Sequence, residues 1–371
     1  MKHYPASTEL FVVGGGPAGL AAAIAARQRG LDVTVADCSV PPIDKACGEG
    51  IMPDGIAAAR ALGIPLEDTA GQPFRGIRFV GNGVSVEADF PNGHGLGVRR
   101  TALHNIMVDR AVDCGVRLLW GARVSGFSGE TVVVDDRSIR TRWIAGADGG
   151  NSIVRRWAGL KEFERDSRRF AFRRHYRTAP WSEFMEIHWG DGCQLYVTPV
   201  ASSEVCVVLI SRDSHLRMED ALARFPEVRA RLAGAAISSR ERGGVTLSRR
   251  LRAVVNRRVA LVGDASGSVD AITGEGLCLL FQHAMLLAQA LEKGDLSVYQ
   301  QEHRHLTRRP EMMADLMLLL DRRRRLRSRT LRAFAAKPRL FARMLATHVG
   351  ELSYFDFAAN GLALGWQLLT A

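Results

Sequence analysis

One segment near the N-terminus constrains the fold more than any other part of the chain. Residues 9–13 form an apolar, partly β-branched run that predicts a buried strand. The run leads directly into a glycine-rich loop, Gly14-Gly15-Gly16-Pro17-Ala18-Gly19. An alanine-rich run at residues 20–26 follows and favours a helix. The glycines therefore form a G-x-G-x-x-G pattern between a strand and a helix, which is the context that a dinucleotide-binding loop needs.

Each glycine of this pattern has a separate physical role. Gly14 permits the tight turn, Gly16 lets a pyrophosphate approach the backbone, and Gly19 lets the helix pack closely on the strand. A second predicted strand at residues 32–36 ends at Asp37, whose carboxylate is placed to accept hydrogen bonds from a ribose. The segment therefore predicts a dinucleotide site, and the alternative is a purely structural glycine turn in some other α/β protein.

The composition is that of a globular enzyme. Of the 371 residues, 47% are hydrophobic and 24% are charged, which excludes disordered, fibrous and disulfide-scaffold proteins. No apolar run is long enough to predict a membrane span, and the first ten residues lack the features of a signal peptide. The six cysteines show neither CxxC nor a metal-ligand spacing. We therefore expect reduced thiols, no metal site and a cytoplasmic protein, with peripheral membrane attachment as an open alternative.

The net charge of +11 is concentrated in one region. Residues 303–343 hold thirteen arginines and lysines against three acidic residues, so the rest of the chain is nearly neutral. No interleaved aromatics or known module accompany them, and we expect no nucleic-acid binding. The densest part, residues 322–332, leads into apolar residues interrupted by Pro338, and the chain ends in an apolar stretch at residues 354–369. This region predicts either a solvated helix face or a surface that docks an anionic membrane or an acyl carrier protein.

Two further blocks also consist of a predicted strand that leads into a glycine-containing loop. A predicted strand before residue 146 ends in Ala147-Asp148-Gly149-Gly150. Another, at residues 258–262, leads into Gly263-Asp264, and then comes Thr273-Gly274-Glu275-Gly276, which opens a long apolar helix at residues 277–291.

In their order and separation the three blocks resemble the FAD-dependent para-hydroxybenzoate hydroxylase superfamily, whose GxGxxG, DG and GD motifs they match between residues 12 and 276. The resemblance implies an α/β fold with a Rossmann-type FAD-binding domain, an inserted antiparallel β-sheet substrate domain and C-terminal helices. It places the FAD-binding domain at residues 1–75, 98–162 and 250–330, the substrate domain at residues 76–97 and 163–249, and a C-terminal helical segment at residues 331–371.

The resemblance also implies which residues contact FAD. They are Gly14, Gly16, Pro17, Ala18, Gly19, Asp37, Cys47, Gly48, Arg100, Asp148, Gly263, Asp264, Gly274, Glu275, Gly276 and Leu277. NAD(P)H is the implied transient electron donor. Two of the residues have an alternative role, because Asp148 and Asp264 each stand where an aspartate would cap a following helix.

Some positions depart from the hydroxylases. Gly267 and Ala271 stand where those enzymes have a histidine and a proline after the GD motif. Gly267, the glycine pair at residues 274–276 and the run at residues 45–51 resemble the geranylgeranyl reductase branch instead. Cys47, at the centre of that run, is expected either beside the flavin or substrate, or as a small buried hydrophobe.

The predicted insert contains strands separated by turn sequences, at residues 76–80, 84–88, 170–175, 184–189, 194–198 and 205–210. In the resembled fold this sheet covers the flavin and contacts the substrate. His175, His188 and Tyr196 are the candidate proton shuttles, and Cys47 is a further candidate catalytic residue. The alternative for each is an ordinary structural residue.

Three functions follow from these observations. The first is an NAD(P)H-dependent FAD monooxygenase that hydroxylates an aromatic or polyketide-like small molecule. The second is a flavin-dependent reductase of C=C bonds in a polyprenyl or lipid substrate. The third is a non-catalytic flavin-binding partner protein.

Overall fold

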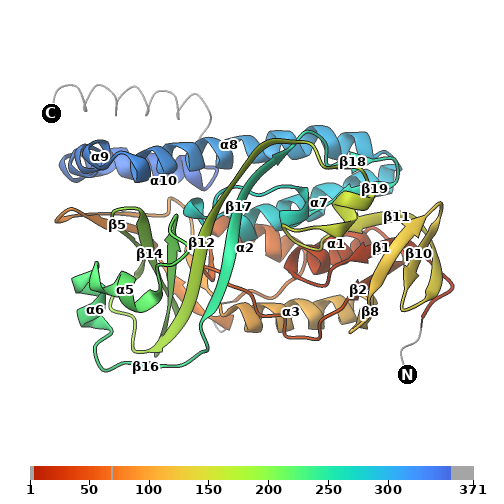
Figure 1. Cartoon of the computed structure of the whole chain (residues 1–371), viewed down its shortest axis with the longest axis horizontal. Coiled ribbons are helices and arrows are strands. Elements are labelled where there is room, and N and C mark those ends of the chain that lie inside the picture. The colour runs from red at the N-terminus through yellow and green to blue at the C-terminus, as the bar shows by residue number, and fades with distance from the viewer. Residues whose placement is uncertain (1–3, 68–69, 352–371) are drawn as a thin grey trace.

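The computed structural model of the chain describes residues 4–67 and 70–351. Figure 1 shows two large sheets arranged along the long axis of the molecule, with helices between and around them. Each large sheet has eight strands, and a small three-stranded sheet accompanies them. This arrangement confirms the predicted α/β class with a Rossmann-type sheet, a second sheet and C-terminal helices.

The first sheet is built on parallel strands. In spatial order these are β19 (Val259–Leu261), β11 (Arg137–Gly146), β1 (Ser7–Val13), β2 (Val33–Asp37) and β8 (Arg117–Trp120). Antiparallel additions complete it: β18 (Val255–Asn256), β9 (Val124–Ser128) and β10 (Thr131–Val134). Val13 lies in register with Ala36 on one side and Gly146 on the other. The carboxyl ends of the three central strands therefore meet at one edge, where the first two glycine-containing blocks begin.

Apolar helices cover this sheet. The central strand β1 is buried over its last four residues, as expected for a parallel strand covered on both faces. The surrounding helices are α1 (Pro17–Gln28), α3 (Arg100–Asp113), α4 (Ile153–Trp157) and α7 (Gly276–Lys293). Nine of the twelve residues of α1 are buried, because it packs between the sheet and α7.

The second sheet is mostly antiparallel. Its strands are, in spatial order, β16 (Ala236–Ile237), β12 (Phe163–Arg177), β15 (Glu204–Ser211), β14 (Cys193–Ala201), β13 (Phe184–Trp189), β5 (Gly76–Gly81) and β6 (Val84–Asp89), with β17 (Arg242–Leu251) also paired to β12. The pair β13 and β5 is parallel. All six strands predicted for the insert are present. Because β17 crosses residue 250, the predicted domain boundary there falls within a strand, and the division into domains stays a prediction.

Side chains of the second sheet alternate between two buried faces. Leu195, Val197 and Val207 pack on one face with α5 (Met218–Ala223) and α6 (Pro226–Arg231). Tyr196 and Val208 belong to the opposite face, which is directed towards the first sheet and the C-terminal helices. Burial of both faces explains why these strands carry almost continuous hydrophobic runs.

The small sheet packs against β14 of the second sheet. It contains β3 (Gly50–Ile51), β7 (Gly95–Gly97) and β4 (Gln72–Phe74). Helix α2 (Pro53–Ala61) follows β3 and contacts α7. The glycines of β7 permit the close approach of β7 to β14, since a Cβ on Gly97 would lie 1.8 Å from the carbonyl oxygen of Pro199 in β14.

Three helices close one side of the molecule (Figure 1): α8 (Leu296–Arg322), α9 (Arg324–Ala336) and α10 (Pro338–His348). The predicted interruption at Pro338 is confirmed, because α9 ends at Ala336 and α10 starts at the proline. Helices α9 and α10 contact β6. None of the helices within residues 4–67 and 70–351 is long and apolar enough to cross a membrane. The apolar stretch at residues 354–369 lies outside the described residues.

Candidate functional site

A cavity of about 1950 Å³ lies where the carboxyl ends of the first sheet face the second sheet. Most of the residues predicted to contact FAD line it. They are Gly14, Gly16, Pro17, Ala18, Asp37, Cys47, Gly48, Arg100, Asp148, Gly263, Asp264, Gly274, Gly276 and Leu277. The candidate catalytic residue Tyr196 lines it as well. The tertiary structure therefore brings segments that are far apart in the chain to one cavity that is large enough for a dinucleotide and a substrate.

The three glycines of the first block differ in what surrounds them. Gly14 has a φ of +109°, and a Cβ there would lie 2.4 Å from the carbonyl oxygen of Ala147. A Cβ on Gly19 would lie 1.8 Å from the carbonyl oxygen of Gly14, so α1 could not pack on β1. A Cβ on Gly16 would meet nothing within 4 Å, and Gly16 lines the cavity. Gly14 and Gly19 thus serve the protein's own packing, whereas the open space at Gly16 fits a ligand approaching the backbone.

Two helices begin at the cavity without a side-chain cap. Gly16 is the N-cap residue of α1, and Glu275 is the N-cap residue of α7. Neither residue makes a side-chain hydrogen bond that caps its helix. Their first N–H groups and helix dipoles favour an anionic ligand. Gly274, at φ +71°, turns the chain into α7, and a Cβ on Gly276 would meet nothing within 4 Å. The pyrophosphate and reduced flavin ring of FAD are the anionic groups that such helix ends suit.

The three aspartates predicted to contact FAD differ in their hydrogen bonds. Asp37 accepts hydrogen bonds from the backbone N–H groups of Gly15 and Ser39, both at 2.7 Å. Asp148 accepts from the N–H groups of Ile153 (2.6 Å) and Val154 (3.1 Å), so it caps α4. Both aspartates also line the cavity. The helix-cap alternative is thus observed for Asp148, and a cofactor contact there remains a prediction.

Asp264 is different, because within the described part of the chain its carboxylate pairs with a lysine and caps no helix. Its side chain is about half exposed in the cavity and pairs with Lys45 across 3.2 Å. Such an exposed ion pair contributes little stability. Asp264 and Lys45 are therefore available to a ligand in the cavity, which fits the predicted contact of Asp264 with FAD.

One wall of the cavity is formed by the second sheet. Ala171, Met185, Tyr196, Val208 and Ile210 form one part of this wall, and β12 and β17 add polar side chains such as Arg168 and Thr246 in another part. The hydroxyl of Tyr196 donates a hydrogen bond to the carbonyl oxygen of Ile272 at 2.7 Å, and burial raises the pKa of this phenol. The tyrosine is thus neutral and its hydroxyl is hydrogen-bonded, and the part of the wall formed by Ala171, Met185, Val208 and Ile210 around it is apolar.

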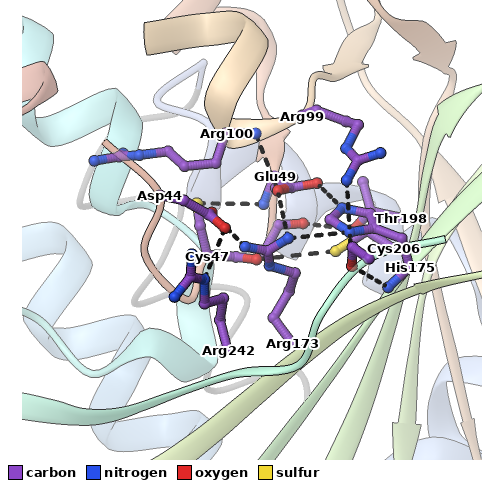
Figure 2. Close-up of polar contacts among 12 residues, drawn as sticks. Asp44, Cys47, Glu49, Arg99, Arg100, Arg173, His175, Thr198, Cys206 and Arg242 are labelled. Carbon is purple, nitrogen blue, oxygen red and sulfur yellow. Dashed lines mark hydrogen bonds and ion pairs between the residues drawn. The ribbon is translucent and has the colours of Figure 1, made fainter. Parts of the chain in front are cut away.

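A buried polar network borders this wall at Glu49 (Figure 2). The Glu49 side chain is 1% exposed, and its backbone has the left-handed φ of +60° that a non-glycine residue seldom adopts. Its carboxylate accepts hydrogen bonds from the N–H of Arg100 (3.0 Å) and from Nε2 of His175 (2.6 Å). The guanidinium of Arg173 lies 3.8 Å away. The carboxylate thus joins the loop after β2 and the start of α3 to strand β12.

The partners of His175 define its proton. Arg99 and Arg173 place guanidinium nitrogens 3.3 and 3.0 Å from its Nδ1. Arginine only donates hydrogen bonds, so Nδ1 is an acceptor and the ring proton is on Nε2, which donates to Glu49. His175 is therefore held between an acidic group at Nε2 and two basic groups at Nδ1.

Glu49, His175 and Cys206 bring three possible metal ligands within 4.8 Å of one another. Two guanidinium groups already supply positive charge at this point, since Arg99 and Arg173 both face His175. Burial also raises the pKa of the Cys206 thiol well above its usual value, which disfavours the thiolate that a metal would need. The arrangement fits an ion-pair network better than a cation site.

Cys47 and Arg100 lie at the boundary between this network and the cavity. Both line the cavity. Burial raises the pKa of the Cys47 thiol, so its sulfur holds a proton. Figure 2 shows the Arg100 side chain extending away from Glu49, and its buried Nε has no hydrogen-bond partner among the described residues. An unpaired guanidinium nitrogen in the cavity fits an anionic or carbonyl-bearing ligand.

Some predicted residues do not line the cavity. Gly19 and Glu275 lie behind it, and His175 is in the network just described. His188 pairs with Glu186 at 2.9 Å elsewhere on the second sheet. The proton-shuttle roles of both histidines remain predictions. Glu49 was not predicted at all, although its position between two glycines of the motif at residues 45–51 was a usable indication.

We expect Gly16→Ala and Gly19→Ala to separate ligand binding from folding. Gly16→Ala should leave the free energy of unfolding of the cofactor-free protein within about 1 kcal/mol of wild type, since its φ of −69° suits alanine. Its methyl group should strongly weaken FAD binding. Gly19→Ala should destabilise by about 2 kcal/mol through overpacking. Urea unfolding and FAD titration measure both, and equal losses of stability would contradict the assignment of Gly16 to the ligand.

Glu49→Gln should be strongly destabilising. Removing one partner of a buried ion-pair network leaves uncompensated charge and costs about 3 kcal/mol. The matched control is Glu87→Gln, because Glu87 pairs with Arg78 but is half exposed, and its loss should cost less than about 1 kcal/mol. Both values come from urea unfolding at neutral pH. Equal effects of the two substitutions would show that the Glu49 network contributes no special stability.

Comparisons with known proteins agree with this site. A model of the FAD binding domain family matches residues 7–295. The chain is 29% identical over 318 residues to a menaquinone reductase from Mycobacterium tuberculosis, with 78% of each chain covered. It is 30% identical over 308 residues to digeranylgeranylglycerophospholipid reductase 1 from Methanopyrus kandleri, covering 72% of this chain and 76% of that protein. A solved flavoprotein/dehydrogenase from Cytophaga hutchinsonii aligns with a TM-score of 0.82 at 18% identity, covering 98% and 99% of the chains.

The family match spans the three motifs and the cavity that they line, and both curated relatives are named enzymes. FAD is therefore the cofactor, and the alternative of a non-catalytic protein is not supported. The chain belongs to the FAD binding domain family of the para-hydroxybenzoate hydroxylase type, and it is a FAD-dependent oxidoreductase.

Proposed function

We propose that the protein reduces a C=C bond in a long apolar lipid, with NAD(P)H as the transient electron donor. The single observation that carries this proposal is the apolar wall formed by Ala171, Met185, Val208 and Ile210 across the cavity from the FAD-binding loops. An apolar wall favours a hydrocarbon substrate because its burial releases water from both surfaces. The relatives named for the reduction of menaquinone and of a digeranylgeranyl phospholipid support the same choice.

The chain's own residues divide the work of binding. The free N–H groups at the start of α1, beside Gly16, would hold the FAD pyrophosphate. Asp37 would hold the adenosine ribose, and Asp264, with Lys45 beside it, would hold the central part of the cofactor. Arg100 would contact the flavin side of FAD. Bound FAD would supply hydride transfer, which no side chain provides.

A reduced double bond also needs a proton. The Cys47 thiol lines the cavity and holds a proton, because burial raises its pKa, whereas the Tyr196 hydroxyl already donates to Ile272. We therefore assign Cys47 as the proton donor at its sulfur. Glu49 positions this thiol, since the Glu49 backbone N–H donates a hydrogen bond to the Cys47 sulfur at 3.4 Å.

Anaerobic turnover tests the reaction. Holoenzyme with NADH or NADPH and menaquinone in detergent micelles, without oxygen, should yield a product that stays heavier by two hydrogen atoms after its quinone ring has been reoxidised. A digeranylgeranyl phospholipid serves as the second substrate. Product that forms only in air and carries labelled oxygen would identify a hydroxylase instead and overturn the proposal. A flavin that neither nucleotide reduces would exclude NAD(P)H as the donor.

Cysteine variants test the proton donor in the same assay. Cys47→Ser should slow product formation at least tenfold while the rate of flavin reduction by NAD(P)H stays unchanged. Cys114→Ser is the matched control, since this half-buried thiol lies at the end of α3, outside the cavity lining. Equal turnover of the two variants would remove Cys47 from the mechanism.

We further propose that the arginines at residues 322–332 hold the protein on an anionic membrane, where such a lipid resides. Six of the seven are exposed. The exception is Arg327, which is buried and paired with Asp191 at 2.9 Å. Each basic residue near an anionic membrane contributes about 1 kcal/mol, and salt screens this attraction.

Reversing the charge at Arg323, Arg325 and Arg329 should weaken binding to phosphatidylglycerol vesicles about a hundredfold or more. FAD should stay bound. Reversal at three exposed arginines elsewhere, namely Arg60, Arg229 and Arg231, is the control that should change vesicle binding less. Co-sedimentation at low and high salt measures the effect. Wild-type protein that ignores vesicles at low salt, or that binds an acyl carrier protein instead, would overturn the membrane assignment.

A further inference from the structure

A second buried polar cluster lies directly behind the start of α7. It contains Asp54 in α2, Glu275 at the N-cap of α7, Arg309 in α8 and His348 at the end of α10. Glu275 is 3% exposed and His348 is 8% exposed. We call these four residues the α7 cluster. None of the roles assigned above to cavity residues uses it.

The charges of the α7 cluster are unbalanced. Both carboxylates share the single guanidinium of Arg309, which lies 4.0 Å from Asp54 and 3.9 Å from Glu275, too far for a good hydrogen bond. Four buried atoms have no hydrogen-bond partner among the described residues: Oδ1 of Asp54, Oε2 of Glu275, Nε of Arg309 and Nδ1 of His348. With both carboxyls ionised, the cluster would hold one uncompensated negative charge.

The tautomer of His348 shows where a proton is needed. Its Nε2 lies 3.1 Å from the carbonyl oxygen of Thr273, which only accepts, so Nε2 carries the ring proton. Its Nδ1 is then a bare lone pair, and it faces Oε2 of Glu275 at 3.7 Å. Two lone pairs facing each other repel, and a proton on Glu275 removes the repulsion. The geometry therefore places a proton on this carboxyl.

The surroundings of Glu275 also favour its protonated state. Burial raises the pKa of Glu275 to about 8, and the negative charge of Asp54 adds to it, while Arg309 opposes both. Burial also raises the pKa of Asp54 and lowers that of His348 to about 4, so the histidine stays neutral. The neighbouring Cys278 thiol is neutral too, because burial raises its pKa.

We propose that the Asp54–Glu275 carboxyl pair takes up a proton when the bound FAD is reduced. Glu275 stands between Gly274 and Gly276, and both glycines line the cavity. The pair lies behind these glycines. Negative charge that reduction adds to a cofactor bound against them would therefore be close to the pair and would favour its protonated state. The proposal rests on FAD as cofactor and does not depend on which substrate the enzyme reduces or hydroxylates.

Two electrons and one proton convert oxidised FAD into its reduced anion. One more proton from solvent forms an O–H bond on the carboxyl pair, so that two protons enter for two electrons. Where the pair is already protonated before reduction, only the first proton enters. The extra proton is therefore expected above about pH 8, where more than half of Glu275 is ionised before reduction.

The experiment measures the midpoint potential of the FAD-loaded enzyme against pH by spectroelectrochemistry, in which the electrode supplies the electrons. For each proton that is taken up with two electrons, the midpoint potential falls by about 30 mV per pH unit. Wild type should show about 30 mV per unit near pH 7.5 and about twice that above pH 8.5. Glu275→Gln, which cannot ionise, should keep the single-proton slope throughout.

Two further variants make the outcome unambiguous. Asp54→Asn leaves Glu275 alone with Arg309, which lowers its pKa, so the two-proton range should begin at a lower pH. Glu292→Gln, at the exposed far end of the same helix, should behave as wild type. If Glu275→Gln does not retain FAD, the Asp54→Asn variant tests the proposal by whether its two-proton range begins at a lower pH than in wild type. A single-proton slope in wild type over the whole range, or a two-proton slope in Glu275→Gln, would overturn the proposal.

Discussion

The buried carboxylate of Glu49 is the interaction on which the arrangement of the site depends. It ties the loop after β2 to β12 through His175 and fixes the start of α3 through the N–H of Arg100. A left-handed glutamate costs of the order of 1–3 kcal/mol in backbone strain, and it persists only where surrounding contacts hold it. Those contacts come from α3 and from β12 of the second sheet. They help to hold the loop that carries Cys47 at the cavity, together with the hydrogen bond from the Thr198 hydroxyl to the carbonyl oxygen of Gly48.

Two uncapped helix starts give the cavity its second constraint. The first turns of α1 and α7 both face the cavity, and a Cβ on Gly16 or on Gly276 would meet no atom of the described residues within 4 Å. A protein that leaves helix N–H groups and glycine faces open in one cavity forgoes stability there. The binding of an anionic cofactor restores it. The conflict between local stability and an open site is typical of positions selected for a ligand.

The sequence allowed much of this site to be predicted, but not all of it. Gly14, Gly16, Gly19 and Asp37 were accessible because strand, loop and helix are contiguous, and their roles follow from local geometry. His175 was chosen as a proton shuttle, yet it lies in an ion-pair network whose other members come from distant segments. Glu49 was missed for the same reason. Its function is set by residues about 50 and 126 positions away in the chain.

The sequence by itself determined the elements and the order of the motifs, because hydrophobic periodicity and glycine patterns act over a few residues. It thereby determined the Rossmann sheet, the strands of the second sheet and the cofactor class. Only the tertiary structure decided that part of the wall facing the cofactor is apolar, that Asp148 caps a helix while Asp264 does not, and that Glu275 meets His348. Burial and charge pairing depend on contacts between segments far apart in the chain, and no local pattern encodes them.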